Sequence, residues 1–352
     1  AYIDDVEFIG ARILKDDFER ANTSAWSAST RPLTAVTHCG QVVTTDAILT
    51  TDLVCPGEEY KSYLIDIGAS NITLDLGGHV LTGHPEGNVI WVENVEGVTV
   101  KNGVITDSLS GIGISDSTSI TVENVMVQNL VNTTPEDNLT GVGTSNSDDI
   151  VVRDCFFDFF WTHHRSALRL ATSEVTADNI EVSDGGVGVD ISGGLSTPGT
   201  QATIINSRFL GSITHGILVQ RTEQSLIADN EFDHTEEAVT CDTHLPGTIT
   251  GLTVENNSIR HSFVGVHFWG NESSSIVNND IAFGVCGILL DQNMMCLDPL
   301  WEGECYYATG NIVSGNTVTN HGTDLRHHPN ALGNTWTDNR CLTKEGAEIP
   351  PC

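Results

Sequence analysis

Acidic side chains, a histidine and a tryptophan recur at matching positions of short apolar segments in the second half of the chain. In the segment VGVHFWG, a strand that buries the second valine and the phenylalanine turns His267 and Trp269 to the opposite face. The same register turns Asp242 and Asp291 outward in the preceding and following segments. Two carboxyl groups on either side of an outward aromatic ring are typical of sites that act on glycans.

Strand alternation extends this face into two columns of outward side chains. Alternate strands of a stack lie about 10 Å apart, so Asp242 and Asp291 would flank the strand that carries His267 and Trp269. The first column contains Arg169, Asp190, Leu218, Thr240, His267 and Leu289, and the second contains Ala171, Ser192, Gln220, Asp242, Trp269 and Asp291.

Each of these residue types has a role in a glycan-acting site. We expect Asp242, with His267 and His244 beside it, to protonate the leaving oxygen, and Asp291 to activate water. Trp269 would stack on a sugar ring. Further expected substrate contacts are Arg169, Arg221, Asp190, His215 and Gln220, and the histidines placed on this flank are His163, His164, His215, His234, His244 and His267.

Each assignment has a plainer alternative. An outward Asp in a chain with 47 acidic residues is often only a solvated charge. An insertion folded over Trp269 would make that ring part of a small second core. Asp242, His244 and His267 could also hold a metal ion, but their spacing supports this weakly, and we assign no metal ligand.

Composition excludes several classes of function. The 352 residues include 47 Asp and Glu but 15 Lys and Arg, a formal net charge of -32. Nucleic acid and anionic membranes are therefore excluded as partners, and no stretch approaches the roughly 18 apolar residues of a membrane helix. The same charge repels a polyuronate unless calcium or arginines screen it, which favours a neutral or weakly charged glycan.

A repeat of about 22 residues is the strongest structural signal. Its core, as in ITVENVMV, alternates apolar and variable residues and then places Asn or Asp, two variable residues and another apolar residue. The alternation predicts short strands, and the polar residue predicts a corner with left-handed backbone, where stacked side chains form a hydrogen-bonded ladder. The predicted corner residues are Asn102, Asn124, Asp154, Asp184, Asn206, Asp229, Asn256 and Asn278, with Gly78 and Gly315 at the ends.

This repeat, with the segments CGQVVTTDAILTTDLVCPG and NITLDLGGHVLTG, resembles the right-handed parallel β-helix (pectin-lyase-like) superfamily of pectate lyases, polygalacturonases and mannuronan C5-epimerases. The resemblance covers about residues 40–340 and implies an all-β, single-domain solenoid of about ten coils. Related lyases often use calcium, which makes calcium a candidate cofactor. The polygalacturonase motifs NTDG, GDD, GHG and RIK do not occur in the sequence, and Asp242, Thr243 and His244 match the epimerase DPH motif only in part.

The chain divides into an N-terminal cap (1–38), the β-helix (39–340) and a C-terminal tail (341–352). Nine Cys and six Asn-X-Ser/Thr sequons indicate an oxidising, secreted or cell-surface location. Pairs that are close in sequence predict three local disulfides, and the other three cysteines fall inside apolar strand patterns. The predicted disulfides are Cys39–Cys55, Cys296–Cys305 and Cys341–Cys352, and the predicted buried thiols are Cys155, Cys241 and Cys286.

Together these observations favour a secreted carbohydrate-active protein, a polysaccharide hydrolase or a lyase or epimerase, working in a groove on the β-helix face. The alternative is a non-catalytic structural, adhesive or filament-forming protein that self-associates along that face, with Trp269 and Leu218 at a subunit contact. A groove beside Asp242 and Asp291 would favour the enzyme, and a flat face covered by a neighbour would favour the alternative.

Overall fold

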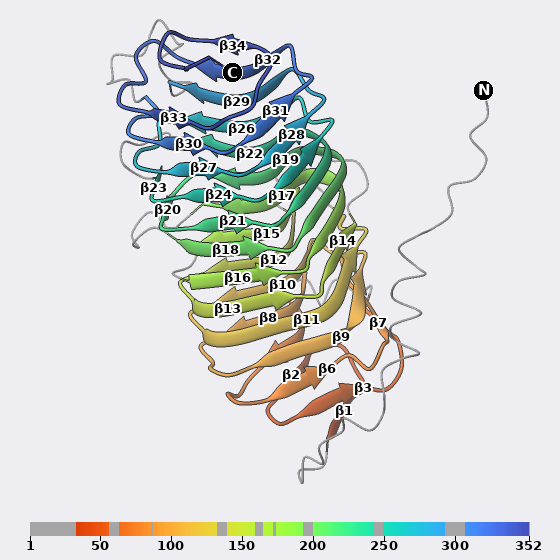
Figure 1. Ribbon diagram of the computed structural model, residues 1–352. Coiled ribbons are helices and arrows are strands. Elements are labelled where there is room, and N and C mark those ends of the chain that lie inside the picture. The colour runs from red at the N-terminus through yellow and green to blue at the C-terminus, as the bar shows by residue number, and fades with distance from the viewer. Residues whose placement is uncertain are drawn as a thin grey trace, which may run out of the picture.

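The computed structural model describes residues 33–55, 63–85, 87–131, 139–158, 165–171, 174–192, 200–242, 249–292 and 307–351. Within these ranges every regular element is a β-strand, and each named strand pairs in parallel with a strand of a neighbouring coil. Figure 1 shows the result, an elongated solenoid whose coils rise from β1 to β34. The described residues contain no helix that is long and apolar enough to cross a membrane.

The coils stack into three faces of one continuous 32-stranded sheet. The first face contains β2 (Gln41–Val43), β5 (Tyr63–Ile67), β8 (Asn88–Glu93), β10 (Ser110–Ser115), β12 (Leu139–Ser145), β15 (Arg165–Ala171), β26 (Val264–Trp269), β29 (Cys286–Asp291), β32 (Thr323–His327) and β34 (Lys344–Glu345). The second face contains β1 (Thr34–Val36), β3 (Ala47–Leu49), β6 (Thr73–Asp75), β13 (Asp148–Arg153), β16 (Glu174–Asp178), β18 (Gln201–Ile205), β21 (Leu226–Ala228), β24 (Thr253–Glu255), β27 (Ser275–Val277), β30 (Ile312–Ser314) and β33 (Thr335–Thr337).

The third face is shorter, because longer strands bend through the corners and serve two faces. Its own strands are β4 (Leu53–Val54), β7 (Val80–Thr82), β14 (Phe156–Asp158), β25 (Ser258–Arg260), β28 (Asp280–Ala282) and β31 (Thr317–Thr319). The strands β9 (Thr99–Thr106) and β11 (Thr118–Gln128) join the second face to the third, while β17 (Glu181–Ile191), β19 (Arg208–Val219) and β22 (Glu231–Asp242) join the third to the first. A separate pair consists of β20 (Thr222–Glu223) and β23 (Ile249–Thr250).

The core is a set of apolar columns that run along the inside of the solenoid. On the first face, residues such as Ile217, Val239 and Val266 are in-register partners on successive strands, and all are fully buried. Phe209 and Phe232 stack with ring centroids 4.8 Å apart. Because each apolar side chain packs on its equivalent in the next coil, the outward residues between them are also held in register.

The corner prediction is confirmed in backbone conformation, with one correction. All ten predicted corner residues adopt positive φ, between 46° and 77°. Strand register, however, places Asn179, also at positive φ, between Asp154 and Asn206, because Arg153 pairs with Asp178 and Asp178 with Ile205. Asp184 belongs to the next corner of its coil. Most coils have two left-handed residues five positions apart, such as Asn124 and Asn129, and in this coil the sequence pattern selected the second of the two.

The predicted ladder forms mainly one residue later than expected. A left-handed residue such as Asn256 points to solvent, and the residue that follows it, Asn257, points into the core and is 1% exposed. The amides of the buried ladder bond one another at 2.9 to 3.0 Å along successive coils. Its members are Asn230, Asn257, Asn279, Asn316 and Asn339.

Removing one rung of this ladder is expected to destabilise the fold. Asn279 donates to the Val254 carbonyl and to Asn316 Oδ1, and its Oδ1 accepts from the backbone and side chain of Asn257. Asn279→Ala leaves these buried groups unpaired, so we expect a loss of about 2–3 kcal/mol in the free energy of unfolding. Chemical denaturation measures it. The exposed Asn330→Ala is the control, and an equal effect in both variants would contradict the ladder's role.

The cysteine predictions are confirmed where the structure describes the residues. Cys39 and Cys55 form a disulfide, and Cys155, Cys241 and Cys286 are buried free thiols. Burial raises the pKa of Cys155 to about 12, so this thiol is unreactive at neutral pH. Cys341 is disulfide-bonded. Its predicted partner Cys352 and the predicted pair Cys296–Cys305 lie outside the described residues.

Strand pairing reaches both expected ends of the β-helix. β1 pairs with β3 from Thr34 onward, and β34 pairs with β32 up to Glu345. The pairing therefore crosses the boundaries expected at 38/39 and 340/341. Most of the expected N-terminal cap lies outside the described residues, so the division into cap, helix and tail stays a prediction.

Candidate functional site

The register predicted for the first face is confirmed. In-register pairing runs through successive strands from β15 to β29, and the second column pairs Asp242 with Trp269 and Trp269 with Asp291. The predicted acids, histidine and tryptophan therefore share one face. The first column, in order along the solenoid, is Arg169, Asp190, Leu218, Thr240, His267 and Leu289.

The centre of this face is more enclosed than alternation alone predicts. His267 is 4% exposed and Thr240 is 2% exposed, although both point away from the core. The Trp269 ring meets the His267 ring edge to face, with centroids 4.3 Å apart and planes at 85°. Trp269 is itself half-buried. It therefore serves partly as a wall for His267, and the part that remains exposed is available to a ligand.

Glu237 is the residue that sequence reasoning missed. Its Oε1 lies 3.5 Å from Nδ1 of His267, and its Oε2 lies 3.8 Å from Nε2 of His215. Thr240 donates a hydrogen bond from its hydroxyl to Oε2. Glu237 reaches these groups because β22 bends between the third and first faces. At the bend the consecutive residues Ala238 and Val239 are both buried, so the side chains before and after it do not follow one inward and outward alternation.

β22 bends at a column of small residues, and these residues can be recognised in the sequence. Gly216 and Ala238 occupy it directly after His215 and Glu237, and a Cβ added at Gly216 would lie 2.6 Å from the Ala238 carbonyl oxygen. Only small residues allow the coils to approach this closely. A small residue recurring directly after a titratable one in successive coils is the signal that could have identified Glu237.

Two carboxyl groups on this face have pKa values shifted in opposite directions. Burial raises the pKa of Asp190 to about 6, and Arg169, whose Nε lies 4.0 Å from Asp190 Oδ2, opposes the shift. Burial also raises the pKa of Glu237, but its contacts with His267 and then with Thr240 and His215 outweigh burial, so the net shift is downward. At mildly acidic pH Asp190 therefore carries a proton while Glu237 is ionised.

A groove extends the face toward the N-terminus. It has a volume of about 330 Å³ and lies over an in-register row in which Gly113 and Gly143 separate Trp91 from Arg169. The indole of Trp91 covers Gly113, where an added Cβ would meet the ring at 2.3 Å. The ring of Tyr63 is stacked with that of Trp91, with centroids 6.2 Å apart. Sequence analysis did not predict this groove.

Several predicted site residues contribute less than expected, or lie elsewhere. Asp291 Oδ1 accepts a hydrogen bond of 2.7 Å from the Gln292 amide, so this carboxylate is partly engaged by its own turn. Gln220 and Arg221 follow the end of β19, and their backbone amides donate to the Ile191 carbonyl. His234 is not on this face, since it lies at the corner that follows the third-face part of β22. His163, His164 and His244 lie outside the described residues.

The family is established by a match to the model of the right handed beta helix region over residues 88–281 and 193–347. The chain belongs to this right-handed parallel β-helix family, as the sequence resemblance predicted. A search of curated proteins finds no match.

Two solved structures with similar folds are a mannuronan C-5 epimerase and a phage tailspike. The AlgE4 A-module of the Azotobacter vinelandii epimerase is 15% identical, with a TM-score of 0.54 over 88% of this chain and 82% of that chain. A tailspike protein mutant of E. coli bacteriophage HK620, in complex with a pentasaccharide, is 10% identical, with a TM-score of 0.55 over 96% of this chain and 76% of that chain. At these identities the likeness concerns the fold.

Proposed function

We propose that the protein is a polysaccharide hydrolase that cleaves a glycosidic bond on the first face of its β-helix. The observation that carries this proposal is the pair of carboxyl groups, Asp190 and Glu237, whose environments move their pKa values apart on one half-buried face. Such a pair is the usual basis for assigning a general acid and a general base. A carbohydrate ligand also agrees with the pentasaccharide complex of the similar tailspike fold.

In this mechanism Asp190 donates its proton to the leaving glycosidic oxygen, and Glu237 removes a proton from the attacking water. Glu237 stands in the row of His215 and Val187, but its Oε2 accepts a hydrogen bond from Thr240, which stands in the row of Asp190. Asp190 and Thr240 are two strands apart along the solenoid, roughly 10 Å. This spacing is close to the roughly 6.5–9.5 Å of inverting glycosidases and well above the roughly 5 Å of retaining ones. His267 and His215 are positioning residues that hold the Glu237 carboxylate.

The glycan would follow the first column from the N-terminal groove to Trp269. Trp91 and His267 are seven strand steps apart, roughly 34 Å, which is enough for an extended oligosaccharide. Trp91 and Trp269 would provide apolar surfaces for sugar rings at the two ends. Arg169, which is half exposed beside Asp190, would donate forked hydrogen bonds to sugar hydroxyls.

The cations on this face favour hydrolysis over the lyase or epimerase reaction. Removal of a proton next to a sugar carboxylate needs a positive charge to stabilise the carbanion. Arg169 is paired with Asp190, and Arg326 lies 3.3 Å from Glu345. Glu345 balances the charge of Arg326, and Arg169 and Arg326 are four and two strands from His267. The charge of -32 also favours a neutral glycan.

We also propose a secreted or cell-surface location, where such a substrate would be encountered. The Cys39–Cys55 disulfide supports an oxidising compartment. Cell fractionation with an antibody against the chain tests this location, and confinement to the reducing cytosol would contradict it.

The proposed function is tested by incubating the full chain with a panel of neutral and uronate-containing polysaccharides. Hydrolysis predicts new reducing ends without unsaturated uronate products, and Glu237→Gln should abolish their release. Unsaturated products would instead show a lyase. Glycan binding without bond cleavage, or oligomers that bury Trp269, would favour the non-catalytic alternative.

The rate of hydrolysis is expected to peak in mildly acidic solution. Asp190 must be protonated, so activity should fall as the pH rises through about 6. Glu237, whose pKa is held below its usual range by His267, should stay ionised and keep activity at a lower pH than a solvated glutamate would. A pH profile of kcat/KM measures both limits. Because Arg169 lowers the pKa of Asp190, Arg169→Gln should move the alkaline limit to higher pH. A profile that stays flat to pH 8 would contradict the role of Asp190.

A further inference from the structure

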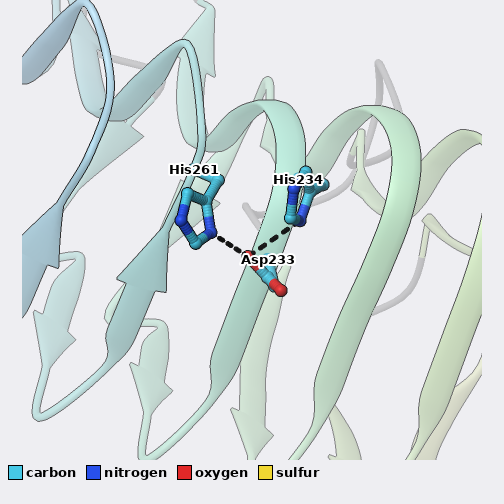
Figure 2. A group of neighbouring side chains, drawn as sticks. All are labelled: Asp233, His234 and His261. Carbon is cyan, nitrogen blue, oxygen red and sulfur yellow. Dashed lines mark hydrogen bonds and ion pairs between the residues drawn. The ribbon is translucent and has the colours of Figure 1, made fainter.

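Two histidines and an aspartate meet at the corner between the third and first faces, away from the proposed glycan site. Asp233 ends the third-face part of β22, His234 follows it, and His261 occupies the same corner one coil later, after β25. Figure 2 shows both imidazoles turned toward the Asp233 carboxylate. Nδ1 of His234 lies 3.0 Å from Asp233 Oδ1, and Nδ1 of His261 lies 2.8 Å from the same oxygen.

The backbone at this corner normally favours other residue types. His234 has φ of 59° and His261 has φ of 52°, in the left-handed region that glycine and asparagine adopt most readily. The equivalent positions carry Gly211 one coil earlier and, after His261, Phe283 and then Asn320, all with positive φ. Histidine tolerates this conformation, and at this corner it brings both imidazole nitrogens to the Asp233 carboxylate.

The surroundings hold the imidazoles in place and leave them accessible. The two rings stack with centroids 4.7 Å apart, and His261 also stacks on Phe283, with centroids 5.3 Å apart. The side chains of His234 and His261 are 65% and 48% exposed. Arg260 is in register with Asp233, but its guanidinium bonds Asp280 on the following coil. The charge of Arg260 is therefore balanced by Asp280 and not by Asp233.

We propose that Asp233, His234 and His261 form a binding site for one first-row transition-metal dication. Their ligand atoms all lie within 4.8 Å of one another. Imidazole nitrogens select such ions over calcium and magnesium, which prefer an all-oxygen site. Adjacent ligands about 2.1 Å from an octahedral ion are about 3.0 Å apart, close to the two nitrogen-to-oxygen distances of 3.0 and 2.8 Å. The remaining coordination positions face solvent and would hold water or an external donor.

The test is a titration of the full chain with Co²⁺, followed by its visible absorption and by calorimetry. His234→Asn and His261→Asn remove one imidazole each while keeping a residue that the left-handed corner accepts. The control is His79→Asn, since Nδ1 of His79 lies 3.2 Å from Asp52 Oδ1 in a contact with a single imidazole. We expect one Co²⁺ equivalent to bind at least about tenfold more weakly in each corner variant, and unchanged in the control.

Three results would overturn the proposal. They are an unchanged titration in His261→Asn, an equal loss in His79→Asn, and displacement of Co²⁺ by equimolar Ca²⁺. Thermal unfolding without metal shows whether each variant is folded. If one histidine variant does not fold, Asp233→Asn, which keeps the side-chain shape, replaces it and should show the same weakening. Because no glycan enters this experiment, its outcome is independent of the proposed hydrolase activity.

Discussion

Glu237→Gln is expected to lower the rate of glycan hydrolysis by about 10²–10⁴-fold, the contribution typical of a positioned general base. The amide keeps the size of the side chain and can still contact Thr240, His215 and His267, but it cannot accept a proton from water. Asp190→Asn should cause a loss of similar size by removing the proton donor. Initial rates of reducing-end release on the substrate that the wild-type protein cleaves measure both effects.

The adjacent residue provides a matched control for Glu237. Glu236 is exposed, whereas Glu237 is half-buried among the histidines. Glu236→Gln changes net charge by the same amount, so its rate should stay within about twofold of wild type if only the local base matters. Equal losses in the two variants would show that overall charge, and not the Glu237 site, controls the rate.

Gly216→Val is expected to cause the largest loss of stability. A Cβ at this position would lie 2.6 Å from the Ala238 carbonyl oxygen and also 2.6 Å from the ring of Phe232. Backbone on one side and a fully buried phenylalanine on the other cannot both move away, so we expect the free energy of unfolding to fall by about 3 kcal/mol. Denaturant titration monitored by circular dichroism measures the loss.

A glycine on the outer side of the same face provides the comparison. At Gly143 an added Cβ would meet only Thr140 Cγ2, at 3.3 Å, so Gly143→Ala should cost less than about 1 kcal/mol. If the two variants were equally stable, the close approach of the coils at Gly216 would not be a constraint on the fold.

Strand alternation is the part of this protein that the sequence predicts best. Trp269 and Asp242 are on the same face because each directly follows a buried residue of a regular strand, Phe268 and Cys241, and the pairing of successive strands follows from the repeat. The left-handed corners were predictable for a similar reason, since few residue types adopt that backbone. Alternation says which way a side chain points, but not how deeply its neighbours bury it, as His267 shows.

The remaining features depend on departures from alternation. Glu237 reaches His267 only because β22 bends at the column of small residues, and the bend is not encoded in the apolar pattern alone. The groove at Gly143 is a gap between larger neighbours, which a single segment does not reveal. His261 meets His234 because corner residues stack across coils, and the repeat pattern marks only the Asn, Asp or Gly corner five residues before each of them.

The most direct test of the central claim is the configuration of the first sugar product, followed by proton NMR during the early phase of hydrolysis. Asp190 and Glu237, two strands apart, predict a product with the anomeric configuration opposite to that of the substrate bond. A first product that retains the configuration, or an unsaturated uronate in its place, would contradict this account of the site.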